Sequence, residues 1–290
     1  MTVSVPSGRV VTRRGMSRVA FAVAAGLLIS CPDARSEPPA RLAVLAPSVA
    51  EIVVELGEGG RIAAACDQCV DAAPSLATLP RVGSYVTPSV EAVVAARPDL
   101  VLVVPSPGNR DAVRQLERLG LPVLVVRDRT LADLWDGIEA IAARIGVPKA
   151  GARLVGRIRH ALQNVEKAVQ DRPRPSVLLA VGRRPLIVAG RGTLQDELLR
   201  IAGAENAAQA LGEAWPTMSL ETLVRDPPDV IIDAAMGDEA GRGGLLPPSL
   251  VGSGAPRIVR VPIDPLVRAG PGVAEAAWML ARELHPGLSK

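Results

Sequence analysis

The chain has 290 residues, of which 48% are hydrophobic and 22% are charged, so it can bury a sizeable core and is not a disordered chain. Its net charge is only +3, and Lys and Arg are scattered, which argues against nucleic acid as a partner because phosphate contacts need a concentrated basic face. Aromatic residues make up only 2%, so the core must be aliphatic and an aromatic residue in a loop stands out.

The N-terminus has the layout of an export signal. Arginines precede the apolar run Val19–Ile29, which is shorter than the roughly 20 residues that span a bilayer and fits a secretory signal peptide over residues 1–36. Ala34-Arg35-Ser36 is a small-x-small cleavage site, whereas Leu28-Ile29-Ser30-Cys31 loosely matches a lipoprotein signal that would anchor the chain through Cys31. A twin-arginine signal at Arg13-Arg14 fits less well, and a buried helix is the structural alternative. We expect an exported, periplasmic protein.

Residues 41–128 alternate short apolar strands with helices. Strands are predicted at Leu42–Leu45, Ile62–Ala65, Leu100–Val104 and Leu121–Val126, and helices at Val49–Leu56, 89–97 and Arg110–Leu119. Ser48 can cap the first helix, which should end at Gly57. Continuously apolar strands that alternate with helices are typical of a parallel sheet covered on both faces, so this region is predicted to form an α/β lobe.

The alternation stops at residues 129–171, where apolar residues recur at helical spacing without a strand pattern. It resumes over residues 176–290. Strands are predicted there at Val177–Val181, Val230–Ile232 and Ile258–Val261, and helices at Leu194–Ile201 and Val273–Leu284. The chain is therefore predicted to consist of an N-terminal α/β lobe, a helical connector and a C-terminal α/β lobe.

An internal repeat relates the two lobes. Thr87–Leu102 aligns with Thr217–Ile232 at an offset of 130 residues without a gap, and each copy resembles a capped helix, a Pro-Asp turn and a buried strand. The matching pairs are Ser89 and Ser219, Glu91 and Glu221, Val94 and Val224, Pro98 and Pro228, and Asp99 and Asp229. Taken singly, each Glu is an ordinary first-turn residue that suits the helix dipole. Taken together, Glu91 and Glu221 form a two-point docking pattern for a two-fold partner with basic pockets.

The order and spacing of several segments resemble a known family. The segments are Leu45–Glu51, Pro80–Tyr85, Pro88–Glu91, Arg97–Val101, Ala189–Gly192, Gly203–Asn206, Trp215–Pro216 and Ser219–Glu221. They are similar to the helical-backbone class of ABC-importer binding proteins, which carry cobalamin, ferric siderophores or haem. The resemblance covers nearly all of residues 41–285.

The resemblance implies an α/β fold of two Rossmann-like lobes with central parallel sheets, joined by a single long α-helix. It also implies a monomer without a cofactor or metal of its own. Its partners would be a metal chelate held between the lobes and a dimeric ABC permease with its ATPase. Glu91 and Glu221 would dock on arginines of that permease.

By position, the resemblance places a set of residues in the ligand cleft: Pro47, Ser48, Asp67, Gln68, Cys69, Tyr85, Trp215, Asp264 and Arg268. Tyr85 and Trp215 suit an apolar ring with a polar edge, although ordinary packing is the alternative. Arg268 can pair with an anionic ligand group, or it is a solvated surface residue.

Departures from the family pattern indicate which of the three ligand classes is favoured. Ser84 stands where haem-binding relatives often have Tyr, and neither His160 nor His285 lies at a position expected for the cleft, so cobalamin or a ferric siderophore ranks above haem. Cys66 and Cys69 are predicted to form a disulfide or to pack in the core, with redox or metal chemistry as the alternative. A four-ligand zinc site would need two more ligands.

An exported α/β hydrolase is the rival class of protein. The sequence has no G-x-S-x-G, H-E-x-x-H, P-loop or G-x-G-x-x-G motif, and its two His residues form no recognisable triad. We therefore predict a binding protein rather than an enzyme. A sensor module that has lost transport stays open as a third class.

Overall fold

The computed structural model describes residues 37–234 and 255–288. The predicted signal peptide, with both cleavage sites and Cys31, lies outside the described residues. None of the helices within the described ranges is long and apolar enough to cross a membrane.

Four parallel strands form the sheet of the first lobe. They are β1 (Leu42–Val44), β2 (Ile62–Ala65), β3 (Leu100–Val103) and β4 (Val123–Val125), in the order β2-β1-β3-β4. The helices are α1 (Pro47–Glu55), α2 (Asp67–Ala72), α3 (Val90–Ala95) and α4 (Arg110–Arg118), with 3-10 turns at Gly59–Arg61 and Pro74–Leu76. Leu42 and Val44 pack in the core cluster that contains α1, whereas Ala43 packs in the cluster with α3 and α4. Both faces are covered, which explains why the strands are apolar throughout.

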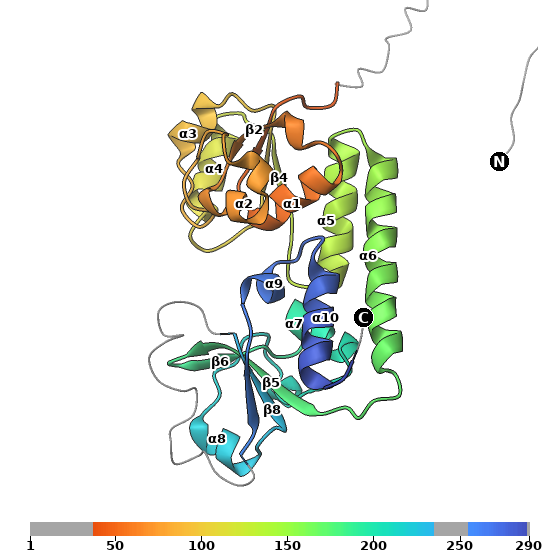
Figure 1. The fold of residues 1–290 in the computed structure, drawn as a ribbon. Helices are drawn as coiled ribbons and strands as arrows, with labels where there is room; N and C mark the ends of the chain where they lie inside the picture. Colours follow the sequence, from red (N-terminus) through yellow and green to blue (C-terminus); the bar gives the residue numbers. More distant parts are fainter. Residues whose placement is uncertain (1–36, 235–254, 289–290) are drawn as a thin grey trace, which may run out of the picture. The chain divides into compact units, whose positions relative to one another are not determined.

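The connector consists of two helices, α5 (Leu131–Arg144) and α6 (Pro148–Val169), which lie side by side (Figure 1). The chain turns between them at Gly146, whose φ of +82° favours glycine. A Cβ on Gly151 would lie 2.5 Å from the Cβ of Ala142, so a larger residue would push the two helices apart. Both helices lie within the predicted connector, but there are two of them where one long helix was expected. The structure adds that the chain reverses within it, so that α6 is the long helix leading to the second sheet.

The second sheet is mostly parallel. Its strands are β5 (Ser176–Arg183), β6 (Leu186–Val188), β7 (Glu205–Asn206), β8 (Val230–Asp233) and β9 (Arg257–Arg260). The order is β6-β5-β8-β9; β7 also pairs with β5, next to the antiparallel β6. The helices are α7 (Leu194–Ile201), α8 (Leu220–Arg225), α9 (Asp264–Val267) and α10 (Val273–Leu284), with a 3-10 turn at Gln209–Leu211. The sequence did not predict β6, β7 or α9.

One predicted helix cap is wrong. The helix α1 begins at Pro47, its N-cap residue is Ala46, and Ser48 is buried within the first turn. Proline fits the first helical position because the N–H that it lacks would have no partner there. Ser48 is therefore part of the packed start of the helix and not its cap.

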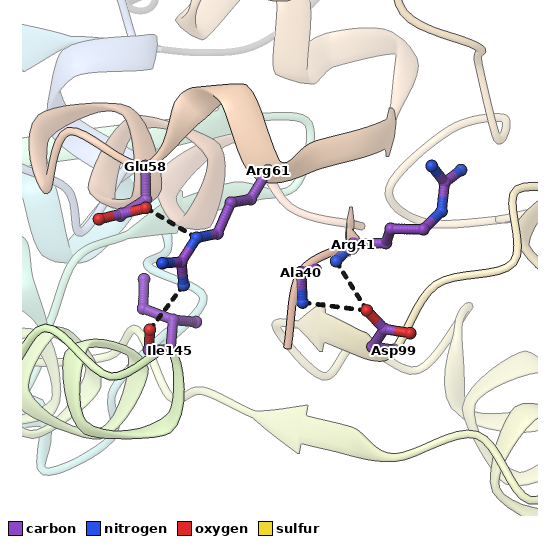
Figure 2. A network of polar contacts seen from close by, with 6 residues as sticks. All are labelled: Ala40, Arg41, Glu58, Arg61, Asp99 and Ile145. Atoms are coloured by element: carbon purple, nitrogen blue, oxygen red, sulfur yellow. Dashed lines mark hydrogen bonds and ion pairs between the residues drawn. The ribbon is translucent and has the colours of Figure 1, made fainter. Parts of the chain in front are cut away.

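Arg61 ties the first lobe to the connector. Its Nη1 donates to the carbonyl oxygen of Ile145 at 2.7 Å, and its Nε lies 2.9 Å from Oε2 of Glu58 (Figure 2). Ile145 is the residue that follows α5. The end of this helix is thus held by a side chain of the first lobe, which satisfies one of its terminal carbonyls.

Candidate ligand-binding and docking sites

The two copies of the internal repeat share their helix cap and burial pattern, although Oγ of Ser89 also donates to Oε2 of Glu91, whereas Oγ of Ser219 hydrogen-bonds with Oγ1 of Thr222. The Oγ of Ser89 accepts a hydrogen bond from the N–H of Ala92 at 3.1 Å, and Oγ of Ser219 accepts one from Thr222 at the same distance. Along the ten residues from Glu91 and from Glu221, side-chain burial matches at nearly every position, and both carboxylates are exposed. The predicted capped helix, turn and buried strand are therefore confirmed in each copy.

The aspartates of the repeat hold each copy to the next strand of its sheet. Oδ2 of Asp99 accepts hydrogen bonds from the N–H groups of Ala40 and Arg41, at 3.0 and 2.9 Å, just before β1 (Figure 2). Oδ2 of Asp229 accepts one from the N–H of Ser176, the first residue of β5, at 2.8 Å. Because β1 pairs with β3 and β5 pairs with β8, each aspartate fixes its helix-turn-strand unit against a central strand.

Glu51 connects two sets of predicted ligand residues that are far apart in the sequence. It follows Pro47 and Ser48 in α1, and its Oε1 lies 2.7 Å from Nη1 of Arg268. Nη2 of Arg268 lies 3.8 Å from Oδ2 of Asp264. Burial raises the pKa of Glu51 above its usual range, and the attraction of Arg268 opposes this shift without cancelling it. Arg268 is therefore an already paired cation.

The loop that carries Tyr85 is fixed through its backbone. The N–H of Tyr85 donates to Oε1 of Gln68 at 3.2 Å, and its carbonyl accepts from Nδ2 of the fully buried Asn109 at 3.1 Å. The N–H of Asp67 donates to the carbonyl of Gly83 at 2.9 Å. The side chain of Tyr85 is 38% exposed. The structure thus brings Asp67, Gln68 and Tyr85 together and leaves the phenol ring accessible.

Cys69 does not fit the role of a ligand contact. It forms a disulfide with Cys66 at the start of α2, and both residues are fully buried. A buried disulfide sulfur presents no surface to a ligand, so we omit Cys69 from the site. The disulfide agrees with one of the two predicted roles of the pair. The described residues contain no group of three or more His, Cys, Asp or Glu that could hold a metal ion.

Trp215 lies beside a pocket of about 440 Å³. Its side chain is 45% exposed, and its loop is held where the N–H of Gly190 donates to the carbonyl of Ala214 at 2.9 Å. The pocket is lined by Asp128, Arg129, Val181, Ile187, Thr193, Gln195, Trp215, Ile263 and Val267. Only Trp215 of this set was predicted. Asp128 and Arg129 follow the carboxyl end of β4, where ligands often bind in α/β folds, so their position was a usable signal.

The charged groups of the Trp215 pocket differ in their surroundings. Burial raises the pKa of Asp128 above its usual range, and the neighbouring Asp133 raises it further. The guanidinium of Arg129 makes no hydrogen bond or ion pair with any described residue. By contrast, Arg183 is buried against Asp233, with 2.6 Å between Nη2 and Oδ2.

The other two tryptophans pack against the core, and the two histidines lie on α6 and directly after α10. Trp135 and Trp278 are partly buried against the main core, and the guanidinium of Arg159 lies 5.1 Å from the ring centre of Trp135. His160 is exposed on α6. His285 is buried, and its Nε2 lies 2.9 Å from the carbonyl oxygen of Ala202. Neither histidine is placed beside Tyr85 or lines the Trp215 pocket.

Comparisons with known proteins agree with this fold. The vitamin B12-binding protein of Pectobacterium atrosepticum is 26% identical over 254 residues, covering 85% of this chain and 88% of the relative. The crystal structure of a periplasmic heme binding protein from Pseudomonas aeruginosa is 27% identical, with a TM-score of 0.75, and covers 87% of this chain and 94% of that one. The periplasmic heme-binding protein BhuT, in complex with two hemes, is 29% identical with a TM-score of 0.71, covering 86% and 99%.

The family assignment rests on a match to a family model. Residues 42–244 match the model of the family described as periplasmic binding protein, which is more than half of the chain. The two α/β lobes, the mostly parallel sheets and the long helix α6 are the architecture of this family's helical-backbone class. This chain therefore belongs to the periplasmic binding protein family.

Proposed function

We propose that this chain is the substrate-binding component of an ABC importer. It captures a cobalamin or an iron chelate between its lobes and delivers it to a dimeric permease with an associated ATPase. Export removes the leader over residues 1–36, and lipid anchoring through Cys31 is the alternative for that segment. The protein works in the periplasm as a monomer, as a binding protein without catalytic activity and without a cofactor of its own.

The observation that carries this proposal is the duplicated docking unit. Glu91 on α3 and Glu221 on α8 are exposed carboxylates in the first turn of equivalent helices, each capped by a serine at the same hydrogen-bond distance. An enzyme has no need for two equivalent exposed carboxylates on separate lobes. A permease with two-fold symmetry can bind both of them with one kind of basic pocket.

The ligand site that we propose combines the Tyr85 loop, the start of α1, the α9 region and the Trp215 pocket. Two accessible aromatic rings in a chain with so few aromatics suit a flat ligand that is apolar on its face and polar at its edge. The proposed contact residues are Pro47, Ser48, Asp67, Gln68, Tyr85, Trp215, Asp264 and Arg268.

Cobalamin is supported as the ligand by the relatives named vitamin B12-binding proteins. Haem is the second candidate, and two observations favour it. Solved structures that are 27% and 29% identical to this chain are named as haem-binding proteins, and the exposed Tyr85 carries a phenol oxygen of the kind that can ligate haem iron.

Titration of the purified chain with cyanocobalamin, haemin and ferric siderophores, followed by Trp fluorescence, tests the proposal. We expect tight binding of one ligand class. Replacing Tyr85 or Trp215 with Ala should weaken it more than tenfold, or by about 1.4 kcal/mol or more. Trp278→Phe is the matched control, since Trp278 packs against the core.

Three outcomes would contradict the proposal in different ways. Full affinity in both alanine variants would remove these two residues from the site. Absence of binding to every chelate would favour the sensor class, and measurable ester or phosphoester hydrolysis would favour the hydrolase class.

A further inference from the structure

The Trp215 pocket has one cationic group without a counter-charge in contact. Its walls are largely apolar, formed by residues such as Val181, Ile187 and Ile263. Arg129 lines the same pocket from the segment between β4 and α5, and its side chain is exposed. Among the described residues, its guanidinium has no hydrogen bond or ion pair. An apolar wall offers an anion no hydrogen-bond donors, whereas an arginine beside it offers a planar set of them.

Arg268, which is itself a proposed contact residue, and the nearby Arg183 are already ion-paired. Arg268 lies 2.7 Å from Glu51, and both side chains are mostly buried. Arg183 lies 2.6 Å from Asp233, and both are almost inaccessible. A ligand anion would have to displace a carboxylate to reach either cation, and that exchange leaves a buried charge unpaired. Arg129 has no ion pair to break, although it is attracted to Asp128.

The polar atoms around Arg129 define what the pocket accepts. Oγ1 of Thr193 accepts from the N–H of Asp196 as the cap of α7 and donates to the carbonyl of Gly190, so its one proton is already used. Nε2 of Gln195 donates to the carbonyl of Leu266 at 2.8 Å. Asp128 and Arg129 attract each other electrostatically, but their side chains make no ion pair. The only uncommitted cation that lines the pocket is therefore Arg129, among the described residues.

We propose that Arg129 is a specificity-determining residue of the ligand site, and that its guanidinium pairs with an ionised carboxylate or phosphate group of the captured chelate. This inference rests on the proposed binding function and goes further, because it requires an acidic group at the edge of the ligand that lies against Trp215. A chelate whose edge carries only amides or esters would gain nothing from Arg129.

Two pairs of ligands distinguish a carboxylate from a phosphate as the group that pairs with Arg129. Haemin carries two propionate carboxylates, and its dimethyl ester carries none. Cyanocobalamin carries a phosphodiester, and dicyanocobinamide lacks it. Each of the four is titrated against the full chain without its leader, and against Arg129→Gln, Arg129→Lys and Arg153→Gln. Arg153 is an exposed arginine on α6 without a described partner, so it controls for the loss of one positive charge.

We expect Arg129→Gln to weaken the acid-bearing member of one pair by about tenfold or more and to leave its acid-free partner unchanged. Arg129→Lys should recover part of the loss, since it keeps the charge but not the planar fork. Arg153→Gln should bind as the wild type does. Equal losses for both members of a pair, or no loss for either, would overturn the role of Arg129 and leave the binding function intact. A wild-type chain that binds none of the four would overturn both proposals for these two ligand classes.

Discussion

Gly190 fixes the loop that carries Trp215, and replacing it with alanine tests how that loop is built. Gly190 is buried, and a Cβ added to it would lie 2.0 Å from the carbonyl oxygen of Glu213 and 3.0 Å from Cδ of Pro216. These two residues flank Trp215 on either side. The first contact is with backbone, so a side chain cannot rotate away to relieve it.

The size of the effect follows from that distance. A carbon atom approaches a carbonyl oxygen to about 3.3 Å at closest, so the 213–216 segment must move by roughly 1.3 Å. Overpacking of this kind costs about 1–3 kcal/mol. The same shift displaces Trp215 from the pocket wall and stretches the 2.9 Å hydrogen bond from Gly190 to Ala214. We expect Gly190→Ala to lose both stability and ligand affinity.

Thermal unfolding followed by circular dichroism, together with a ligand titration, measures both effects. Each kcal/mol lost should lower Tm by about 2–4 °C for a chain of this size. Gly156→Ala is the matched control: Gly156 lies within α6 with no atom near its added Cβ, so alanine there should stabilise the chain by about 0.5–1 kcal/mol. If Gly190→Ala melted at or above the wild-type Tm and bound ligand normally, the steric argument would be refuted.

Three further predictions concern charged residues. Reversing Glu91 and Glu221 together to Lys should abolish uptake in a transport assay and leave ligand affinity unchanged, whereas Glu139→Lys on α5 should transport normally; uptake by the double variant would remove the docking role. Because burial raises the pKa of Glu51 above its ordinary value of 4.5, its ionisation costs the folded state free energy. The free energy of unfolding of the wild type, measured in urea relative to that of Glu51→Gln, should therefore fall as pH rises from about 4.5 through the raised pKa. A rise in this difference over the same pH range would contradict the prediction. Asp128→Asn should strengthen binding of an acid-bearing ligand severalfold, since it removes a negative charge next to Arg129. Weaker binding in a ligand titration would count against an anionic ligand group at Arg129.

Local sequence patterns predict several elements well because each pattern reports burial along that element. Ile62–Ala65, Leu194–Ile201 and Val273–Leu284 have the predicted bounds. The two- and three-residue strands β6 and β7 were missed because their pairing with β5 decides them, and so few residues carry no periodic signal. The chain reversal inside the connector was also missed, although Gly146 and Pro148 mark the turn.

In the proposed site, the residues that the sequence indicated are those of a rare type. Tyr85 and Trp215 drew attention because the chain has few aromatics, and both are exposed. Arg129 is one of many arginines, and only its place beside Trp215 distinguishes it. The pairing of Arg268 with Glu51 joins residues 217 positions apart, so no local pattern could have predicted it.

If Glu91 and Glu221 dock as proposed, the duplication of the Ser-capped helix has a consequence for how the binding protein and its importer change over time. A permease built from two copies of one polypeptide presents the same residues to both lobes of the binding protein, so one substitution in the permease gene alters two contacts simultaneously. A compensating change in this chain must then occur twice, once near Glu91 and once near Glu221. Because two changes are needed, the sequence of the docking surface should change more slowly than that of the ligand pocket.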